Sequence, residues 1–492
     1  MPIIYLKPLN QSIEVSKGTP LIDVLNEFAV AFPCGGRGTC GGCKVRILDG
    51  SIPVDPGHQK RLDELGLSND WRLACLSRVE ADVTLLVDQW RHLILADQSD
   101  FEFEPRPGTG IAVDVGTTTL VAQLIDLQTA EIKAAATDVN PQSRFGADIM
   151  SRVEYAVRQD SALLTRLIRA KVYDLILRLL EQKYTADRIV LVGNTVMHHL
   201  FCGYDLSPLS MYPFESPHSG QVNLTPEDLD WQLEGDPTIA FMACIGGFVG
   251  SDILAGILAS GMHKSNAISC LIDLGTNGEI AVGNRKKILC ASTAAGPAFE
   301  GINISCGMQA ATGALASLQF KDEQLTYHVI GDTDSLRGIC GSGLLDAVSG
   351  LLESGQLDEW GQLTNGQDRV EVIPGLSLTQ NDIRQVQLAK GAVAAGLQIL
   401  SGKRCGSLDA VDQFYIAGAF GNYLNLNSAR RIGLVDAEPD RVRTLGNSAL
   451  LGAKIMLYME EAQIQSILHA IQHLSLETDA DFQETFAMKM LF

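Results

Sequence analysis

One pattern occurs twice in this chain and constrains its fold more than any other feature. Residues 111–120 read IAVDVGTTTL, and residues 270–280 read CLIDLGTNGEI. In each, an apolar strand ends at an aspartate, Asp114 or Asp273, and a glycine-threonine pair then turns the chain into a second apolar run. Glycine permits such a tight turn, and the successive backbone N–H groups of the turn can bind an anion. The pattern therefore predicts two strand–turn–strand hairpins, each with a phosphate-binding loop.

A third segment places these hairpins in a wider pattern. Residues 414–422 read FYIAGAFGN, a strand that breaks into glycines. A single Asp-x-Gly-Thr turn also suits an ordinary hairpin, but two of them before a glycine-rich strand end favour a nucleotide-binding cleft. In this order the segments resemble the phosphate-1, phosphate-2 and adenosine motifs of the actin, sugar-kinase and Hsp70 ATPase superfamily. The resemblance covers roughly residues 109–470 and implies a duplicated, ribonuclease-H-like ATPase fold.

The resemblance also implies roles for the residues at the turns. Asp114 is expected to hold Mg²⁺ through water, because magnesium prefers oxygen ligands and keeps much of its hydration. Asp273 is expected to help organise the magnesium and the attacking water. Asp252, in the segment GGFVGSD, begins a predicted helix, so its side chain either caps that helix or contacts the nucleotide or its metal. The other residues expected to contact the nucleotide are Gly116, Thr117, Thr118, Gly275, Thr276, Asn277, Gly418 and Gly421.

The N-terminal region carries a second constraining pattern, the stretch PCGGRGTCGGCKVRI. Cys34, Cys40 and Cys43 have the spacing C-x5-C-x2-C, and Cys75 follows at a distance. Four thiolates, three of them in one glycine-rich loop, are what a [2Fe–2S] cluster needs. A structural zinc site is the alternative, but zinc ribbons usually pair their cysteines in C-x2-C knuckles, which the lone Cys75 fits poorly. The spacing is similar to that of vertebrate-type and bacterial ferredoxins, which implies a β-grasp fold.

Charge and composition limit the classes of partner. The net charge of −20 argues against nucleic acid, which needs clustered Lys and Arg. The most apolar stretch, residues 241–262, contains Asp252 and five glycines, so it indicates a buried helix and no membrane span. The first residues have no signal-peptide architecture, and we expect a cytoplasmic protein. Eleven cysteines in a cytoplasmic protein suggest metal or cluster chemistry rather than disulfides. Basic residues near the cluster ligands form either a docking rim or ordinary solvated surface; they are Arg37, Lys44, Arg46, Arg72 and Arg78.

These observations predict a multidomain protein of the α+β and α/β classes. The predicted parts are a [2Fe–2S] ferredoxin-like domain (1–95), a linker (96–108), a first ATPase lobe (109–265), a second lobe with the final cleft helix (266–470) and a C-terminal tail (471–492). The linker is polar and acidic and contains two prolines. Residues 446–453, GNSALLGA, resemble the final cleft segment of the ATPase superfamily.

Further segments resemble one family within this superfamily, the reductive activators of corrinoid proteins. These proteins join an N-terminal [2Fe–2S] domain to an actin-like ATPase module. The resemblance implies ATP-dependent transfer of one electron from the cluster to a Co(II) corrinoid, which restores Co(I). It further implies a corrinoid protein or methyltransferase component as partner, an upstream low-potential reductant and a homodimer. The segments are NPQSRFGADIMSRV (140–153), LVGNTVMHHLF (191–201), GGFVGSD (246–252), AAGPAFEG (294–301) and GICGSGLLDA (338–347).

Other readings of the sequence stay open. One is a small-molecule kinase or dehydratase-activator-like ATPase with an appended ferredoxin domain, and another is a pure electron carrier. Cys306 and Cys340 resemble the cysteines with which dehydratase activators hold a [4Fe–4S] cluster between subunits, but buried thiols are the favoured interpretation. His198 and His199 are adjacent on a predicted helix, point to different faces and are interpreted as packed or surface residues. The sequence assigns no role to NPQSRFGADIMSRV or AAGPAFEG.

Overall fold

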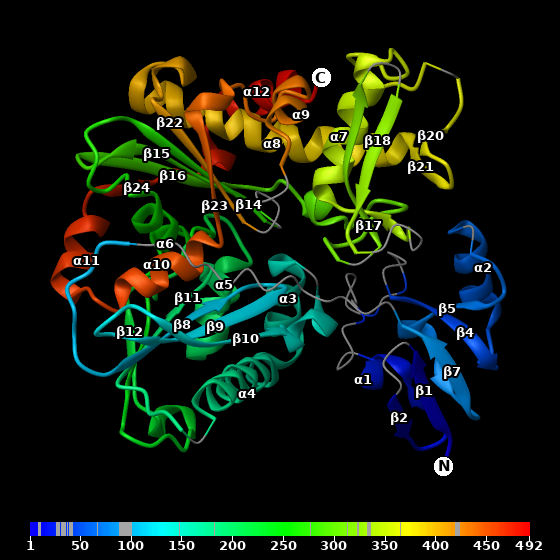
Figure 1. Cartoon of the computed structure of the whole chain (residues 1–492), viewed down its shortest axis with the longest axis horizontal. Coiled ribbons are helices and arrows are strands. Elements are labelled where there is room, and N and C mark those ends of the chain that lie inside the picture. The colour runs from blue at the N-terminus through cyan, green and yellow to red at the C-terminus, as the bar shows by residue number, and fades with distance from the viewer. Residues whose placement is uncertain are drawn as a thin grey trace.

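The computed structural model contains an N-terminal domain followed by two lobes (Figure 1). It describes residues 1–7, 11–25, 30, 36, 38, 43–65, 67–87, 101–146, 148–181, 183–275, 277–311, 313–321, 324–331, 336–364, 366–418 and 424–492. Four of the residues predicted to bind the cluster or the nucleotide lie outside this set, namely Cys34, Cys40, Thr276 and Gly421.

The N-terminal domain is built on a five-stranded sheet with the order β2-β1-β7-β4-β5. β1 pairs with β2 in the antiparallel and with β7 in the parallel direction. Leu21 of α1 and Leu62 of α2 are completely buried together with Ile4 and Leu6 of the sheet. This mixed sheet with its covering helices agrees with the predicted β-grasp fold. Its elements are β1 (Ile3–Lys7), β2 (Gln11–Glu14), α1 (Leu21–Leu25), β4 (Lys44–Gly50), α2 (Pro56–Glu64), β5 (Trp71–Leu73) and β7 (Val83–Leu86), with a small pair β3 (Thr19–Pro20) and β6 (Arg78–Val79).

The first lobe contains a six-stranded sheet with the order β10-β9-β8-β11-β13-β12. β8, β9 and β10 form an antiparallel meander, and β11 adds to β8 in the parallel direction through the crossover helix α4. α4 covers one face of the sheet with Leu164, Ile168 and Val172. The elements are β8 (Thr109–Val115), β9 (Thr119–Asp126), β10 (Ile132–Val139), α3 (Ile149–Tyr155), α4 (Ser161–Leu180), β11 (Arg188–Val192), α5 (Thr195–Cys202), β12 (Val222–Leu224), β13 (Thr238–Phe241) and α6 (Ser251–Ser260).

The second lobe repeats this topology, as the duplicated sequence pattern predicts. Its sheet has the order β23-β22-β14-β15-β16-β24, in which β14, β15 and β16 form the meander and β22 is parallel to β14. β14 of the second lobe therefore corresponds to β8 of the first. The strands are β14 (Ser269–Leu274), β15 (Gly278–Asn284), β16 (Lys287–Thr293), β22 (Gln413–Ala417), β23 (Val442–Gly446) and β24 (Ile471–His473).

Two helices fill the space between the sheets of the lobes (Figure 1). Leu254 and Leu258 of α6 pack with α10 (Ser448–Met456) against the first lobe. On its other face, α6 packs Ile253 and Ile257 against the sheet of the second lobe. Residues 241–262, the most apolar stretch of the sequence, thus form a loop and the buried helix α6. Among the helices that the structure describes, none has the length and apolar run needed to cross a bilayer.

The remaining elements decorate the second lobe. They are β17 (Ala314–Lys321), β18 (Gln324–Val329), β19 (Gly338–Ile339), α7 (Gly341–Glu353), β20 (Arg369–Ile373), β21 (Leu376–Thr379), α8 (Gln380–Cys405), α9 (Leu426–Arg431), α11 (Glu461–Leu468) and α12 (Phe482–Lys489).

The segment 471–492, which the sequence analysis sets apart as a tail, contributes β24 and α12 to the second lobe. β24 pairs with β16 in the lobe's sheet. Gln387 of α8 donates a 3.0 Å hydrogen bond to the carbonyl of Met490, and the buried Lys390 ammonium donates to the carbonyl of Leu491.

The second half of the predicted linker lies on the ATPase lobes. The rings of Phe101 and Phe103 pack against Tyr458, with centroids 5.6 and 5.0 Å apart. Arg106 Nη2 lies 2.6 Å from Glu460 Oε1. These contacts hold the chain from Phe101 onward, just beyond the end of α10.

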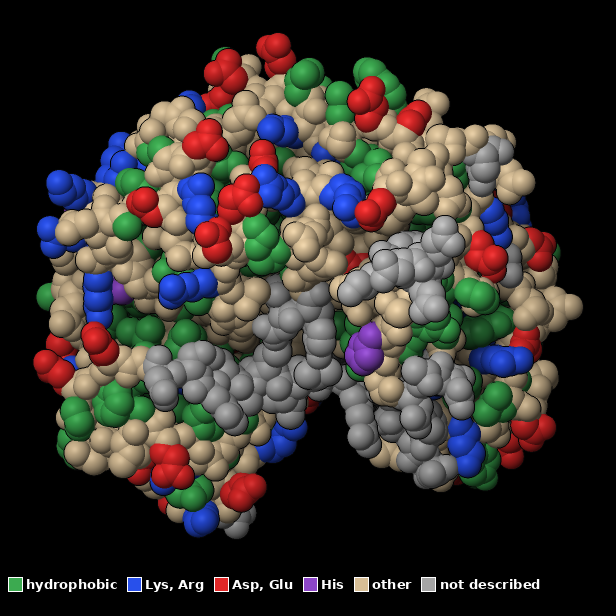
Figure 2. Space-filling model, turned by 45° about the horizontal axis from the view of Figure 1, so that its top comes forward, with side chains coloured by type: hydrophobic (Ala, Val, Ile, Leu, Met, Phe, Trp, Pro, Cys, Tyr) green, Lys and Arg blue, Asp and Glu red, His purple; other side chains and the backbone are tan. Residues whose placement is uncertain are grey.

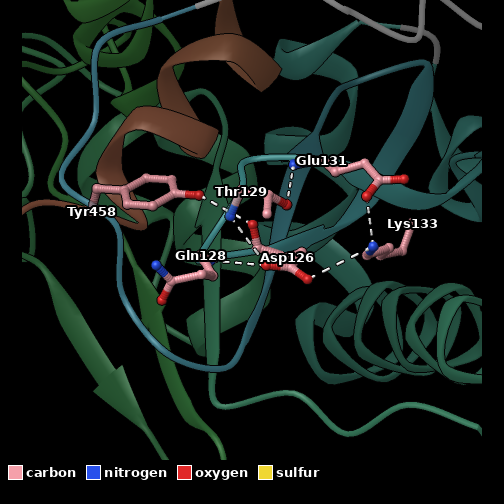
Figure 3. A network of polar contacts seen from close by, with 6 residues as sticks. All are labelled: Asp126, Gln128, Thr129, Glu131, Lys133 and Tyr458. Atoms are coloured by element: carbon pink, nitrogen blue, oxygen red, sulfur yellow. Dashed lines mark hydrogen bonds and ion pairs between the residues drawn. The ribbon is translucent and has the colours of Figure 1, made fainter.

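A polar network supports this anchor from the β9–β10 turn (Figure 3). The Tyr458 hydroxyl donates a 3.5 Å hydrogen bond to the carbonyl of Asp126. The Asp126 carboxylate accepts hydrogen bonds from the backbone N–H groups of Gln128 and Thr129 and lies 3.7 Å from Lys133 Nζ. These bonds shape the turn.

Candidate functional site

The two repeated turns face one cavity of about 330 Å³ between the lobes. All of the described residues that the sequence predicts for nucleotide binding line this cavity. They are Asp114, Gly116, Thr117, Thr118, Asp252, Asp273, Gly275, Asn277 and Gly418. The structure thus brings together side chains from the first lobe, the second lobe and the end of β22. A turn that pointed away from its counterpart would have excluded a shared nucleotide site.

The first turn, between β8 and β9, requires glycine and is held by neighbouring amides. A Cβ on Gly116 would lie 2.4 Å from the carbonyl oxygen of Thr119, so no larger residue fits. Asn140 Nδ2 donates a 2.9 Å hydrogen bond to the carbonyl of Gly116, and Asn194 Nδ2 donates a 2.8 Å hydrogen bond to Thr117 Oγ1. From the sequence, Asn194 was interpreted either as facing the cleft or, preferably, as a turn residue, and it lines the cavity. Sequence reasoning did not assign Asn140, because its partner lies across the fold and no local pattern reveals it.

The second turn meets the end of β22. Gly275 N–H donates a 3.1 Å hydrogen bond to the carbonyl of Asn277, which closes the turn. Gly418 has a φ of +92°, and a Cβ there would lie 2.9 Å from the carbonyl oxygen of Leu274 and 3.1 Å from Asp273 Oδ1. Glycine is therefore required at 418 for the close approach of β22 to the aspartate.

α10 begins between the two aspartates. Asn447, its N-cap residue, accepts a 2.8 Å hydrogen bond from Leu450 N–H and donates through Nδ2 to Asp114 Oδ2 at 3.0 Å. Ser448 lines the same cavity, and its hydroxyl beside Asp273 lowers the pKa of that carboxyl against the effect of burial. One helix end therefore lies beside the turn aspartates of both lobes.

Four buried carboxyl groups give the cavity its electrostatic character. Burial raises the pKa of Asp114 to about 7, partly offset by the Asn447 hydrogen bond. Burial raises the pKa of Asp273 to about 6, and burial together with the charge of Asp273 raises that of Asp252 to about 8. The pKa of Glu279, which the sequence analysis did not select, is also raised well above its usual value by burial and by the charge of Asp252. Each of these groups is more readily ionised beside a cation.

These carboxylates fit a hydrated magnesium ion better than a directly liganded metal. Among the residues that the structure describes, no three His, Cys, Asp or Glu side chains converge closely enough to bind a metal ion together. Mg²⁺ typically keeps several of its waters and takes one or two carboxylates with the substrate phosphates. Asp114 and Asp273, on opposite sides of the cavity, suit that mode of binding.

Asp252 does not act as the helix cap. α6 has Gly250 as its N-cap residue, and Asp252 lies in the first turn of the helix. Its carboxylate accepts a 2.8 Å hydrogen bond from the N–H of Ile253 and lines the cavity. A contact of Asp252 with nucleotide or metal stays a prediction.

Arg152, which the sequence analysis did not select, holds the first turn from behind. Its guanidinium is completely buried and donates hydrogen bonds to the carbonyls of Thr117 (2.5 Å) and Gly146 (2.9 Å). A third, longer bond of 3.3 Å reaches Gln142 Oε1. Burial lowers the pKa of Arg152 to about 9, while the charges of Asp148 and Glu300 raise it. The sequence feature that could have identified Arg152 is its position on the apolar face of a helix, beside Ile149 and Val153.

Two of the four predicted cluster ligands lie side by side in the N-terminal domain. Cys43 directly precedes β4, and Cys75 lies in the short helix Ala74–Leu76. Their sulfur atoms are 3.2 Å apart, and the N–H of Ala74 donates a 2.9 Å hydrogen bond to the carbonyl of Cys43. Two sulfurs this close can bind a single iron, as the [2Fe–2S] prediction requires.

The three described arginines near the cluster ligands are engaged within the domain. Arg46 Nε lies 2.5 Å from Asp70 Oδ2, Arg72 donates to the carbonyl of Ile52, and Arg78 donates to that of Gly18. On the face shown in Figure 2, basic and acidic side chains are interspersed. The docking-rim interpretation therefore gains no support from these arginines.

The other described cysteines are packed thiols. Cys340 lines the cavity and donates to the carbonyl of Leu315, whereas Cys306 packs against a different apolar cluster. Burial raises the pKa of Cys306 to about 12. Burial likewise raises the thiol pKa values of Cys202, Cys244, Cys270 and Cys290.

Comparison with known families and proteins agrees with this arrangement of parts. A family model described as a 2Fe-2S iron-sulfur cluster binding domain matches residues 4–80. The model of the RACo middle region matches residues 109–265, and that of the C-terminal domain of RACo, the ASKHA domain, matches residues 267–492.

Two curated relatives match most of the chain. The corrinoid activation enzyme RamQ of Eubacterium limosum is 34% identical over 448 residues, which cover 82% of this chain and 74% of that protein. The [Co(II) methylated amine-specific corrinoid protein] reductase of Methanosarcina barkeri is 25% identical over 420 residues, covering 78% and 77% respectively.

A solved structure shows the same fold over the whole chain. The protein described as a reductive activator for corrinoid, iron-sulfur protein superposes with a TM-score of 0.69 at 24% identity. The match covers 100% of this chain and 98% of the other. The order of a ferredoxin-like domain and a duplicated ATPase module is therefore shared.

Proposed function

This chain belongs to the family of reductive activators of corrinoid proteins, and we propose that it uses ATP to move one electron from a [2Fe–2S] cluster to the Co(II) corrinoid of a partner protein. The electron restores Co(I), the form that corrinoid methyltransferases use, and leaves the cluster oxidised. The observation that carries the proposal is the meeting of both Asp-x-Gly-Thr turns in one cavity, in a chain that also pairs Cys43 with Cys75.

The N-terminal domain supplies the electron. Cys34, Cys40, Cys43 and Cys75 would hold the cluster, and when bound it provides one electron at a potential near −400 mV, typical of plant-type clusters. Reduction of Co(II) corrinoids requires a very low potential, so the transfer runs uphill. Each 100 mV of deficit costs about 2.3 kcal/mol per electron, which ATP must offset.

The ATPase lobes supply the driving force. Asp114 and Asp273 would organise the hydrated Mg²⁺, and Thr117 and Thr118 the phosphates. Asn447 keeps the Asp114 carboxylate oriented towards the cavity. Nucleotide can shift a conformational equilibrium only if it binds the two states differently. Two lobes hinged around a cavity lined from both sides provide such states, since closure brings the two turns together.

The proposal extends to the electron donor, the oligomeric state and the location of the protein. We propose that an upstream low-potential reductant reloads the cluster and that the protein acts as a homodimer. We also propose a cytoplasmic location, because a thiolate-bound cluster suits a reducing compartment.

One experiment separates this function from its alternatives. The protein is reduced, mixed anaerobically with an oxidised corrinoid protein, and the Co(I) absorbance is followed with and without MgATP. We expect Co(I) to form only with MgATP. Equal formation without nucleotide would indicate a pure electron carrier. ATP turnover that depends on an added hydroxyl or carboxylate acceptor would indicate a small-molecule kinase.

A further inference from the structure

The N-terminal domain is ion-paired to the first lobe of the ATPase module and lies near the second (Figure 1). Asp23 of α1 forms a 2.8 Å ion pair with Arg144 of the first lobe. On the second lobe, the charge of Lys44, the residue after Cys43, acts on the Cys306 thiol and lowers its pKa against the larger effect of burial. Figure 1 shows the domain lying beside α3 and below β17. A domain that is paired to one lobe and lies near the other is sensitive to their relative position.

Arg144 belongs to a segment whose first and last residues both donate hydrogen bonds to the first phosphate turn. Asn140, at the start of the segment, donates to the carbonyl of Gly116. Arg152, at its end, donates to the carbonyl of Thr117. Arg144 projects from the middle towards Asp23. The residues that hold the turn and the residue that holds the N-terminal domain therefore lie on one short stretch of chain.

The described residues of this segment, 140–146 and 148–152, pack closely against one another and against the lobe. A Cβ on Gly146 would lie 2.5 Å from the Cβ of Ser151, so the two halves of the segment are in close contact. Arg152 is completely buried and bonds the carbonyl of Gly146 as well as that of Thr117. Gln142, also buried, donates to the carbonyl of Leu164. Because close-packed groups have no free space between them, a displacement of the turn is transmitted to the residues packed against it.

The second lobe faces the same segment across the cavity. Glu300, in the AAGPAFEG stretch, lines the cavity, and its charge raises the pKa of the Arg152 guanidinium. Closure of the cavity around nucleotide would change the separation between the lobes at this point. Asp23, which is paired with the first lobe, would then change its position relative to the second lobe.

We propose that residues 140–152 transmit the nucleotide state of the first phosphate turn to the N-terminal domain, with Arg144 as its docking residue. Asn140 and Arg152 are the positioning residues that couple the segment to the turn. Nucleotide binding then releases Asp23 from Arg144 and frees the domain to present its cluster. This inference rests on the proposed function, because it assigns a purpose to the cluster and the nucleotide site together.

The strength of the ion pair suits a contact that is made and broken. The Arg144 and Asp23 side chains are 32% and 45% exposed. Exposed ion pairs contribute about 0.2–1 kcal/mol, so losing this one changes the docking equilibrium by at most about five-fold. A contact of this size biases the domain without locking it.

Hydrogen–deuterium exchange on the full-length, cluster-loaded protein tests the proposal without any corrinoid protein. The probe is the magnesium complex of adenylyl imidodiphosphate, and the peptides of interest cover residues 19–25 and 140–146. In the unmodified protein we expect the analogue to speed exchange at residues 19–25, by at most about five-fold. In Arg144→Glu, exchange there should be fast without nucleotide and should no longer respond.

A charge swap and a matched control complete the design. Combining Arg144→Glu with Asp23→Arg restores the ion pair in reverse, so the nucleotide response should return. Arg158→Glu removes a comparable exposed pair, with Glu154 at 2.8 Å, that does not touch the N-terminal domain, and it should behave as the unmodified protein. The proposal is overturned if exchange at 19–25 ignores the analogue, or if Arg144→Glu responds normally.

The coupling end of the segment has its own test. Arg152→Lys keeps the charge but lacks the planar fork that reaches two carbonyls. Its affinity for the analogue is measured by calorimetric titration, and at a concentration that saturates the variant we expect the response at residues 19–25 to be lost. A normal response in this variant would show that Arg152 is only structural.

Failure of the two proposals is distinguishable. The exchange response is read without a corrinoid partner, so it survives even if no Co(I) forms. Conversely, ATP-dependent Co(I) formation with no exchange response would leave the activity intact and remove the proposed route.

Discussion

Asn447 Nδ2 donates a 3.0 Å hydrogen bond to Asp114 Oδ2, although 333 residues separate them along the chain. The bond joins the N-terminus of α10 to the turn that opens the ATPase module. The neighbouring Ser448 lies beside Asp273, so a single helix end touches the key carboxylates of both lobes. The nucleotide site is therefore assembled only when the last part of the module has folded against the first.

Removing the Asp114 carboxylate should abolish ATP-driven activity but spare the cluster. Asp114→Asn retains the size of the side chain and loses the charge that organises Mg²⁺. We expect ATP hydrolysis to fall by about 10²-fold or more, the scale seen when a preorganised charge contact is removed. The visible spectrum of the cluster should not change. The control is Asp126→Asn, in the β9–β10 turn outside the cavity. If this variant hydrolysed ATP as slowly as Asp114→Asn does, the assignment of Asp114 would be contradicted.

Removing a predicted cluster ligand should abolish the cluster but spare nucleotide binding. Cys75→Ala takes away one of the two sulfurs that lie 3.2 Å apart. We expect loss of the visible absorption and of stoichiometric iron after anaerobic reconstitution, with nucleotide binding retained. Cys405→Ala, a half-buried thiol in the second lobe, should bind iron normally. Two bound irons per chain in Cys75→Ala would disprove ligation by this residue.

The α6–α10 contact should tolerate no additional atom. A Cβ on Gly452 would lie 2.1 Å from the carbonyl oxygen of Ala255, so Gly452→Ala forces the helices apart. Overpacking of this kind costs about 1–3 kcal/mol. It should also weaken nucleotide binding, because α10 carries Asn447. Calorimetric melting and titration with the ATP analogue measure both effects.

Gly402→Ala is the matched control for that substitution. Gly402 also lies within a helix, α8, but nothing stands within 4 Å of its Cβ position. Alanine reduces the conformational freedom of the unfolded chain, so we expect stabilisation of about 0.4–1 kcal/mol. Equal melting temperatures for the two variants would contradict the packing argument.

His198 should make the first lobe sensitive to mild acid. Burial, with the charge of His199, lowers its pKa to about 4, whereas the unfolded chain titrates near 6.5. Between these values the unfolded state binds more protons, so stability is present above pH 6.5 and is lost as the pH falls towards 4. From pH 7 to 5.5 the loss from this group is about 1 kcal/mol.

His198→Phe isolates that contribution. The variant cannot be protonated at this position, so its melting temperature should fall less between pH 7 and 5.5 than that of the unmodified protein. The difference between the two pH profiles is the quantity to measure. Parallel profiles would show that His198 is already accessible to protons in the folded state.

The sequence was informative where chemistry is local. Strand–Asp-x-Gly-Thr–strand units predicted both turns, because glycine and the strand pattern are readable without the fold. GNSALLGA was recognised as a cleft segment by resemblance, and it places Asn447 and Ser448 in the cavity. The cysteine spacing pointed to the cluster, and the described pair Cys43 and Cys75 is close enough to share an iron.

What sequence reasoning missed depends on contacts between distant segments. Arg152 and Asn140 act on backbone carbonyls of a turn that lies on another strand, and a carbonyl carries no sequence signal. Glu279 was hidden in an apolar strand, and its environment becomes acidic only when both lobes meet. The anchoring of Phe103 on Tyr458 was equally invisible, since composition alone marks its segment as a linker.

The central claim is that nucleotide drives an electron from the cluster to a corrinoid. The most direct measurement is the rate of Co(I) appearance when the cluster-reduced protein meets Co(II) corrinoid protein and MgATP, with Asp114→Asn run alongside at equal cluster content. The account predicts rapid Co(I) formation by the unmodified protein and almost none by the variant. Equal rates for the two proteins would contradict it.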